Sequence, residues 1–245
     1  MAHKIIYALF DDGAQSVFNT FKNDHEVAVY SFGIQKKETV IHCDLSDLKG
    51  FFNLTKHLPQ PDLVFASPPC ETFSMASASH YRKTNKGGNL YYYSDGSPIT
   101  DLIDWLSGSC NNIVAYKGDK RKYFEEISKK RKSHALLHEN TEKIIKYFDV
   151  PFAIENPMAS LAWHKFYQNS SELLVVPDYY DSFAFYSAYS RNLTEKPTRI
   201  RSNFQLVLKP KPRFRVRTLK QVHNSNDRSA MPHELIRSIV NQLLI

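Results

Sequence analysis

Short apolar segments rich in β-branched and aromatic residues recur along the chain, and they constrain its fold more than any other feature. The segments are Ile5 to Phe10, Val27 to Phe32, Val40 to Leu45, Leu63 to Ala66 and Phe152 to Glu155. Such runs are typical of buried parallel strands. Helix-like stretches lie between them, namely Ala14 to Phe21, Leu45 to His57 and Ala135 to Phe148. This alternation predicts an α/β fold with a doubly wound, mostly parallel sheet.

The length and composition favour one compact globular unit. The chain has 245 residues, of which 42% are hydrophobic and 13% aromatic, and this content excludes a disordered protein. No run approaches the roughly 20 apolar residues that cross a membrane. The N-terminus enters an apolar strand pattern without a cleavage signal, so we expect a cytoplasmic protein with no membrane partner.

The C-terminal part has a different texture, with many tyrosines and prolines from about Leu173 onward. Two strand-like runs, Asn203 to Leu208 and Arg213 to Leu219, are separated by the turn sequence KPKP and predict a hairpin. The final residues, HELIRSIVNQLLI, predict a helix that packs on the sheet. We therefore expect a catalytic domain of residues 1–202 and 227–245 and a small basic hairpin of residues 203–226.

The formal charge of +7 favours a polyanionic partner. On a strand, Arg213, Arg215 and Arg217 would share one face suited to phosphates or base edges, although a basic edge strand also protects against aggregation. Residues 117–132 carry eight basic and three acidic side chains. That stretch predicts a surface helix or loop, either a solvated face or a DNA contact.

The most informative string is Leu63-Val-Phe-Ala-Ser-Pro-Pro-Cys70-Glu-Thr-Phe-Ser74, in which a buried strand enters a rigid turn that presents a thiol. Ligands of doubly wound sheets gather at the carboxyl ends of strands, so Cys70 is a candidate nucleophile. The alternative is a small buried hydrophobe. Cys43 and Cys110, the other two cysteines, form no C-x-x-C pair with it, so neither a disulfide framework nor a metal site is indicated.

A second string, Phe152-Ala-Ile-Glu155-Asn156-Pro157, brings a carboxylate and an amide to the end of another buried strand. A charged residue at the end of a buried strand usually has a functional or structural role, because burying a charge is costly. Glu155 could otherwise cap a helix or pair with an arginine.

Together these strings resemble the DNA cytosine carbon-5 methyltransferases, whose Pro-Cys and Glu-Asn motifs occur in this order on such strands. The resemblance covers nearly the whole chain. Leu9-Phe10 corresponds to the start of the cofactor loop, and Asp44 to an acidic residue that meets the adenine. The string from Lys196 to Asn203 is similar to the arginine-bearing strand, and the string from Arg228 to Leu235 to the C-terminal motif. The texture is similar to small phage-encoded members, which implies a bacterial or phage-infected host cell.

The resemblance implies a class I methyltransferase-like, Rossmann-like sheet with a small C-terminal β-rich target-recognition region. It also implies methyl transfer from S-adenosylmethionine to carbon 5 of a cytosine flipped out of a DNA duplex. Cys70 would add to carbon 6, while Glu155, Asn156 and Arg199 or Arg201 would hold the ring edge. The implied cofactor contacts are Phe10, Asp11, Asp12, Gly13, Asp44, Ser67 and Pro68. The implied DNA contacts are Arg213, Arg215, Arg217, Lys209 and Lys211.

The chain departs from the family at the methyl-donor pocket. Such donors usually meet a glycine-rich turn after the first strand, and only Gly13 is present here. The second strand also lacks a terminal acidic residue for the ribose hydroxyls, and Asp11 or Asp12 could cap the following helix instead. Two alternatives therefore stay open: a catalytically inactive DNA-binding relative, and a carbon-5 pyrimidine-modifying enzyme with an altered donor. RNA is also an open substrate, because flipped and single-stranded cytosines look alike locally.

Overall fold

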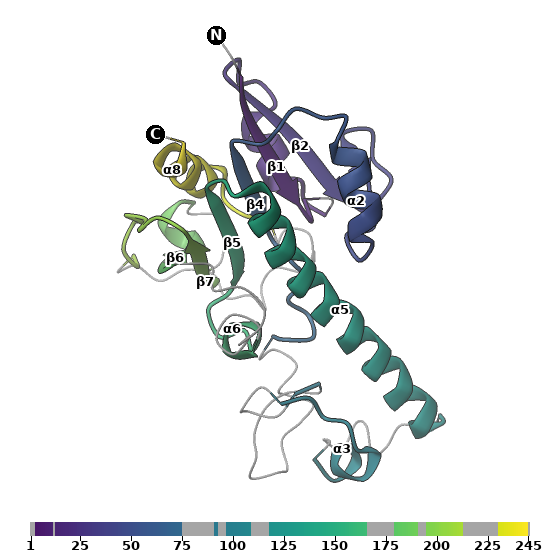
Figure 1. Cartoon of the computed structure of the whole chain (residues 1–245). Coiled ribbons are helices and arrows are strands. Elements are labelled where there is room, and N and C mark those ends of the chain that lie inside the picture. Colours follow the sequence, from purple (N-terminus) through teal and green to yellow (C-terminus); the bar gives the residue numbers. More distant parts are fainter. Residues whose placement is uncertain are drawn as a thin grey trace. The chain divides into compact units, whose positions relative to one another are not determined.

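A computed structural model describes residues 3–11, 13–74, 91–92, 97–108, 118–165, 179–190, 195–212 and 230–244 (Figure 1). The chain forms two compact units. The first comprises Met1–Pro68, Asn140–Met158 and Val176–Ile245, and the second comprises Pro69–Glu139 and Ala159–Val175. The predicted division into residues 1–202 with 227–245 and a hairpin of 203–226 stays a prediction.

The first unit is built on a seven-stranded sheet with the order β3-β2-β1-β4-β5-β7-β6. Strands β1 to β5 are parallel, and β7 runs antiparallel to both β5 and β6. The strands are β1 (Lys4–Leu9), β2 (Val27–Gly33), β3 (Val40–His42), β4 (Leu63–Ala66), β5 (Phe152–Pro157), β6 (Tyr180–Phe185) and β7 (Pro197–Ser202). The predicted doubly wound, mostly parallel sheet is confirmed.

The strand order reverses between β1 and β4, because β1 pairs with β2 on one side and with β4 on the other. This 3-2-1-4-5 order is that of Rossmann-type sheets, in which ligands bind outside the carboxyl ends of the strands at the reversal. Phe10 follows β1 and Ser67 follows β4 at this edge. The backbone N–H of Ser67 donates to Leu9 O over 3.2 Å and so holds the two strand ends together.

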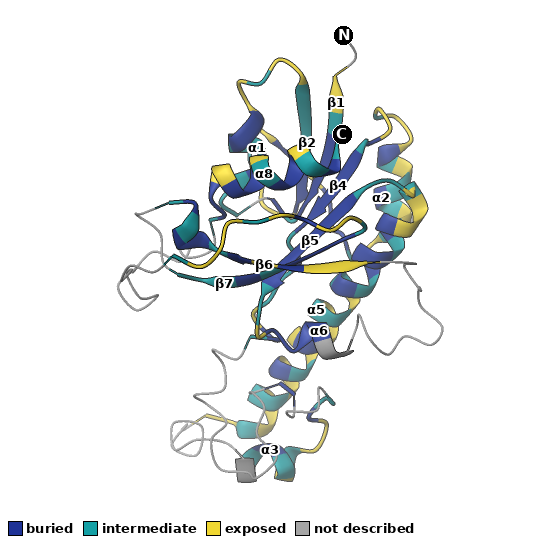
Figure 2. Ribbon diagram, turned by 90° about the vertical axis from the view of Figure 1, so that its left-hand side faces the viewer, coloured by how far each residue is buried: buried dark blue, intermediate teal, exposed yellow. Residues whose placement is uncertain are grey.

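Helices cover both faces of this sheet. On one face, α1 (Ser16–Phe21) and α8 (His233–Leu243) lie beside each other (Figure 2). They bury an apolar cluster that includes Ile6, Ala8, Leu63, Phe65, Leu235, Ile236, Ile239 and Val240. The predicted C-terminal helix is confirmed, and its apolar residues pack on the sheet as expected.

The opposite face carries an aromatic cluster, because successive side chains of a strand point to opposite sides. The rings of Tyr7 and Phe32 lie 5.0 Å apart, and Phe32 lies 5.2 Å from Phe51 on α2 (Leu48–Thr55). Phe148, at the end of α5 (Lys120–Phe148), lies 5.3 Å from Tyr7 in an edge-on contact. Such edge-on pairs are a favoured aromatic geometry, and they fix both helices to the sheet.

The predicted hairpin strand at Asn203 to Leu208 is wrong, since residues 203–212 have no regular secondary structure. The chain turns directly after β7, where the Ser202 hydroxyl donates to Phe204 O over 2.7 Å. The backbone N–H of Val207 donates to the Gln242 side chain and not to a strand. The β-rich C-terminal part consists instead of β6 and β7. The second predicted hairpin strand, Arg213 to Leu219, lies outside the described residues.

The second unit contains α3 (Leu102–Gly108), α6 (Ala162–Lys165) and residues 120–139 of α5. Its core includes Phe73, Tyr92, Trp105 and Ile127. The charge-dense stretch 117–132 enters α5, and most of its basic side chains are exposed. Arg131 is the buried exception, and its guanidinium donates to Ile99 O.

Within the described parts of the chain, no helix is long and apolar enough to cross a membrane.

Candidate active site

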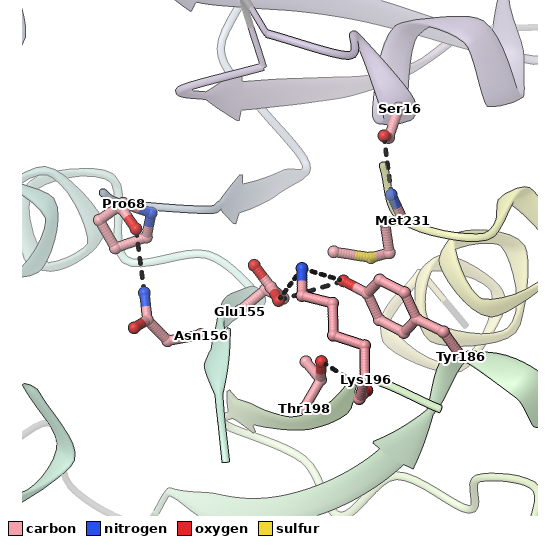
Figure 3. Close-up of polar contacts among 8 residues, drawn as sticks. All are labelled: Ser16, Pro68, Glu155, Asn156, Tyr186, Lys196, Thr198 and Met231. Carbon is pink, nitrogen blue, oxygen red and sulfur yellow. Dashed lines mark hydrogen bonds and ion pairs between the residues drawn. The ribbon is translucent and has the colours of Figure 1, made fainter. Parts of the chain in front are cut away.

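The two motif-bearing strands, β4 and β5, are parallel neighbours that pair Ala66 with Ile154. Their continuations therefore leave the sheet at the same edge, with Ser67-Pro68 beside Glu155-Asn156. The Asn156 amide is completely buried, and its Nδ2 donates to Pro68 O over 2.9 Å (Figure 3). The amide of one motif thus holds the backbone of the other, two residues before Cys70.

A second buried side chain holds the next proline. Nε2 of His138 lies 3.0 Å from Pro69 O. Burial lowers the pKa of His138 to about 4, and the charge of His134 adds to this effect. The ring is therefore neutral at physiological pH, and Nε2 must carry the proton that is donated to the carbonyl. Sequence reasoning missed His138, and its only signal was its position in the 135–148 helical pattern.

Cys70 is half-buried and begins a turn in which Phe73 N donates to Cys70 O over 3.0 Å. The Pro69 carbonyl directly before it is bonded to His138, so the backbone next to the thiol is held within the second unit. A thiol on a fixed, partly exposed turn is suited to nucleophilic attack. Cys43 differs, because burial and the neighbouring Asp44 and Asp47 raise its pKa to about 11.

Glu155 is buried at the end of β5, where one oxygen of its carboxylate has two partners (Figure 3). The Tyr186 hydroxyl donates to Oε1 over 3.1 Å, and Lys196 Nζ lies 3.6 Å from the same oxygen. Tyr186 begins the 3₁₀ helix η2 (Tyr186–Ala188), and Lys196 directly precedes β7. Burial and the charge of Glu155 raise the pKa of Tyr186, so its hydroxyl keeps its proton and acts as a donor.

Sequence reasoning missed both partners of Glu155. Lys196 lay in the string that resembles the arginine-bearing strand, but only the two arginines were singled out there. Tyr186 lay among the many aromatic residues between 179 and 189. The antiparallel pairing of β7 with β5 brings Lys196 to Glu155, and the pairing of β6 with β7 brings Tyr186 there. Neither motif signals these pairings.

The two arginines lie on the opposite side of the strands from Glu155. The β5–β7 register pairs Asn156 with Arg199 and Ile154 with Arg201, whereas Glu155 pairs with Ile200. Directly opposed residues share a face, and successive residues alternate. Arg201 is buried and donates from Nε and Nη2 to Asp181, each over 2.8 Å. Arg199 Nη1 donates to the same carboxylate over 3.3 Å.

The loop after β1 was expected to bind a methyl donor. The carboxylate of Asp11 in this loop instead accepts hydrogen bonds from the protein itself. Asp11 is buried, and its oxygens accept from the backbone N–H groups of Val17 and Phe18 and from the Ser31 hydroxyl, over 2.9 to 3.0 Å. Helix capping, the alternative role for this residue, is therefore observed. Phe10 has a positive φ of 63°, an uncommon backbone conformation for a residue other than glycine. Asp12 lies outside the described residues.

Other residues at this edge fit a donor of the S-adenosylmethionine type. Apart from its neighbours along the chain, no described residue has a heavy atom within 4 Å of the position where a Cβ on Gly13 would stand, so the described backbone there borders open space. Asp44 follows β3 and is exposed, and its Oδ1 accepts only one local bond among those described, from Ser46 N. A donor would thus be held by Asp44, by backbone groups around Gly13 and by Ser67-Pro68, and not by the Asp11 carboxylate.

The predicted DNA contacts are only partly described. Arg213, Arg215 and Arg217 lie outside the described residues, as does Cys110. Lys209 and Lys211 are exposed and form ion pairs with Glu234 and Glu195.

Comparison with solved structures finds similar folds, among them the two that follow. No family model and no curated protein matches the chain. Among solved structures, the methyltransferase EhMeth of Entamoeba histolytica is 12% identical with a TM-score of 0.42, over 88% of this chain and 58% of its own. The Dnmt2 methyltransferase of S. pombe is 13% identical with a TM-score of 0.45, over 83% of this chain and 52% of its own. The chain therefore spans a little over half the length of these two proteins.

Proposed function

We propose that this chain is an S-adenosylmethionine-dependent methyltransferase that modifies carbon 5 of cytosine in DNA. One observation carries the proposal. Strands β4 and β5 are parallel neighbours, and the side chain of Asn156 in the Glu-Asn motif is hydrogen-bonded to Pro68 in the Pro-Pro-Cys motif. The two motifs that resemble the cytosine carbon-5 enzymes thus leave the sheet at one edge, where Rossmann-type sheets bind ligands.

The chemistry accounts for the residue types. Carbon 5 of cytosine is a poor nucleophile until a thiolate adds to carbon 6. Cys70 forms this carbon–sulfur bond, and the displaced electron pair makes carbon 5 enamine-like. S-adenosylmethionine supplies an electrophilic methyl group when it is bound. Loss of the carbon 5 proton and departure of the Cys70 thiolate then restore the aromatic ring.

Glu155 acts at the edge of the ring. Addition of the thiolate drives negative charge toward N3, which a shared proton at a carboxylate neutralises. The same carboxylate accepts from the exocyclic amine. Asn156 acts indirectly, because its described hydrogen bond goes to Pro68 and steadies the turn that carries Cys70.

The two arginines of β7 have different roles from the residues of the two motifs. Arg201 is buried against Asp181, so it stabilises the β6–β7 pair in the resting protein. Arg199 is less buried than Arg201 and shares Asp181 with it. Because both arginines lie on the opposite side of the strands from Glu155, neither is assigned to the ring edge that Glu155 meets. The predicted basic contacts at Lys209, Lys211, Arg213, Arg215 and Arg217 supply the phosphate or base contacts that a DNA enzyme needs.

The loop after β1 favours a second candidate function. The Asp11 carboxylate caps α1, and β2 ends in Phe32-Gly33 without an acidic residue. These features suit a carbon-5 enzyme with an altered donor, or a DNA-binding relative that does not turn over.

Two measurements separate these functions. Calorimetric titration with S-adenosylmethionine should show binding. A duplex that contains 5-fluorocytosine should then form a complex with the protein that survives a denaturing gel, because fluorine at carbon 5 cannot leave as a proton. The complex should be absent with Cys70→Ala and unaffected by Cys43→Ala. Donor binding without a Cys70-dependent complex would refute the mechanism, and a complex formed without donor binding would favour the altered donor.

A further inference from the structure

The two oxygens of the Glu155 carboxylate have different surroundings. Oε1 accepts from the Tyr186 hydroxyl over 3.1 Å and lies 3.6 Å from Lys196 Nζ. Among the described residues, Oε2 has no hydrogen-bond or ion-pair partner. Figure 3 shows one carboxylate oxygen directed at Lys196 and Tyr186 and the other directed away from them. The protein therefore fixes one oxygen and leaves the second available.

Lys196 is itself held in place by several contacts. Its Nζ donates to the Tyr186 hydroxyl over 3.2 Å and lies 4.6 Å from the centre of the same ring. Its carbonyl accepts from the Thr198 hydroxyl over 3.2 Å. Its side chain is only 14% exposed, and its backbone has a positive φ of 22°. A non-glycine residue keeps such a backbone only where its surroundings enforce it, and strained residues of this kind gather at functional sites.

We propose that Tyr186 and Lys196 are positioning residues that hold Oε1 of Glu155 and aim Oε2 at the edge of the flipped base. This inference rests on the proposed function and assigns two residues to it. A carboxylate that rotates about its terminal bond presents its oxygens in many directions. The hydrogen bond from Tyr186 and the ion pair with Lys196 oppose that rotation at Oε1, so Oε2 meets N3 and the amine with a smaller loss of entropy.

The two residues have separable contributions. Tyr186→Phe keeps the ring, its packing and its cation–π contact, and it removes the hydroxyl that donates to Oε1 and accepts from Lys196. A hydrogen bond to a charged group typically supports a rate factor of about 10- to 100-fold. Lys196→Met removes both the ion pair and the donor to Tyr186, so we expect it to be at least as harmful. Because positioning acts on the reacting state, kcat should fall while KM for DNA stays nearly constant.

The test is a double-mutant cycle. Tyr186→Phe and Lys196→Met are made in the wild-type chain and in Glu155→Gln, and two rates are measured on a DNA duplex. One is methyl transfer, and the other is donor-independent release of tritium from carbon 5 of cytosine. In wild type, each substitution should lower kcat about 10- to 100-fold. In Glu155→Gln neither should lower it further, since both residues act through that carboxylate.

Two control variants match these changes. Tyr7→Phe removes another buried tyrosine hydroxyl, which donates to Pro59 O over 2.7 Å away from the motifs. Lys4→Met removes another lysine ion pair, with Asp62 at 3.9 Å. Both should keep kcat within about twofold of wild type, because neither residue touches Glu155.

The outcomes separate the inference from the function on which it rests. A wild-type chain without either rate overturns the proposed function and the inference with it. An active wild type with an unchanged kcat in Tyr186→Phe overturns the inference alone. An equal additional loss in the Glu155→Gln background does so too, because it would show that Tyr186 acts through general stability.

Discussion

The side-chain amide of Asn156 donates to the carbonyl oxygen of Pro68 over 2.9 Å, and this bond joins the Glu-Asn segment to the Pro-Pro-Cys segment. Proline has no backbone N–H, so a Pro-Pro turn has few local ways to satisfy its carbonyls. The structure satisfies both of them with buried side chains, since Asn156 bonds to Pro68 and His138 to Pro69. Residues far away in the sequence therefore bind both proline carbonyls that precede Cys70.

Replacement of Asn156 by Ala should reduce both stability and turnover. The lost bond leaves a buried carbonyl unsatisfied, which should lower the free energy of unfolding by about 1 to 3 kcal/mol. The loosened turn should lower kcat at least about tenfold. The matched control is Asn140→Ala, since Asn140 is equally buried and donates to Leu45 O and Ser46 O. Urea denaturation should show similar losses for both variants, and an equal loss of kcat in both would contradict a specific role for Asn156.

Cys70 should be the reactive thiol of the described chain, and Cys43 should be inert. Because the pKa of Cys43 is raised to about 11, only about one molecule in a thousand carries its thiolate at pH 8. Alkylation with iodoacetamide at pH 8, in a Cys110→Ser background, should therefore label Cys70 first. Peptide mass spectrometry identifies the site. Faster labelling of Cys43 would show that Cys70 is protected and would count against a nucleophilic role.

Asp11 and Asp44 should respond to substitution in opposite ways. Asp11→Ala removes the acceptor for the first turn of α1 and for Ser31, so the free energy of unfolding should fall by about 2 kcal/mol. Asp44 is exposed, so Asp44→Ala should change stability by less than about 0.5 kcal/mol. Calorimetry should instead show weaker S-adenosylmethionine binding for Asp44→Ala. A normal donor affinity in that variant would remove Asp44 from the donor pocket.

The parallel part of the sheet could be predicted from the sequence, because its strands are short apolar runs rich in β-branched and aromatic residues that alternate with helix-like stretches. The run Leu63 to Ala66 matches β4 at both ends. The run Val40 to Leu45 was predicted too long, since β3 ends at His42 and Asp44 starts a turn with Ser46. The hairpin failed for another reason. Residues 203–208 alternate as a strand does, but β7 already occupies the position beside β5.

The residues of the two motifs could be predicted from the sequence. The residues that hold them in place through hydrogen bonds and ion pairs could not. Cys70 and Glu155 lie at strand ends, where chemistry concentrates in such folds. His138, Tyr186 and Lys196 support them through contacts that cross from one element to another. Their spacing in the sequence carries no signal of those contacts, because η2, β7 and α5 reach the motifs only through the tertiary fold.

Arg201 should contribute more to stability than Arg199. Arg201 is almost fully buried and donates to Asp181 from both Nε and Nη2, whereas the bond from Arg199 to the same carboxylate is longer. Arg201→Met removes two hydrogen bonds to Asp181 and leaves it the longer one from Arg199, which should cost about 3 kcal/mol of unfolding free energy. Asp181→Asn in the same chain should recover more than half of that loss. Arg199→Met should cost less than about 1 kcal/mol, and equal costs for the two arginines would contradict this order.

His138 should make the protein lose stability as the pH falls below neutrality. Burial holds the pKa of the folded His138 at about 4, whereas an unfolded histidine has a pKa near 6.5. Between about pH 6.5 and 4 the unfolded chain binds a proton that the folded chain excludes. The free energy of unfolding should therefore decrease by up to about 1.4 kcal/mol per pH unit on acidification, and the loss should level off below pH 4.

The measurement is urea denaturation at half-unit steps from pH 7.5 to 4, on wild type and on His138→Gln. Glutamine can still donate to Pro69 O but does not titrate in this range. The free energy of unfolding of His138→Gln should therefore change less steeply with pH than that of wild type. The difference should be most of the roughly 1.4 kcal/mol per pH unit expected from His138. A part of the slope should persist, because burial also lowers the pKa of His134. Identical slopes in the two proteins would show that His138 takes up its proton without unfolding, and the bond to Pro69 would then not depend on a neutral ring.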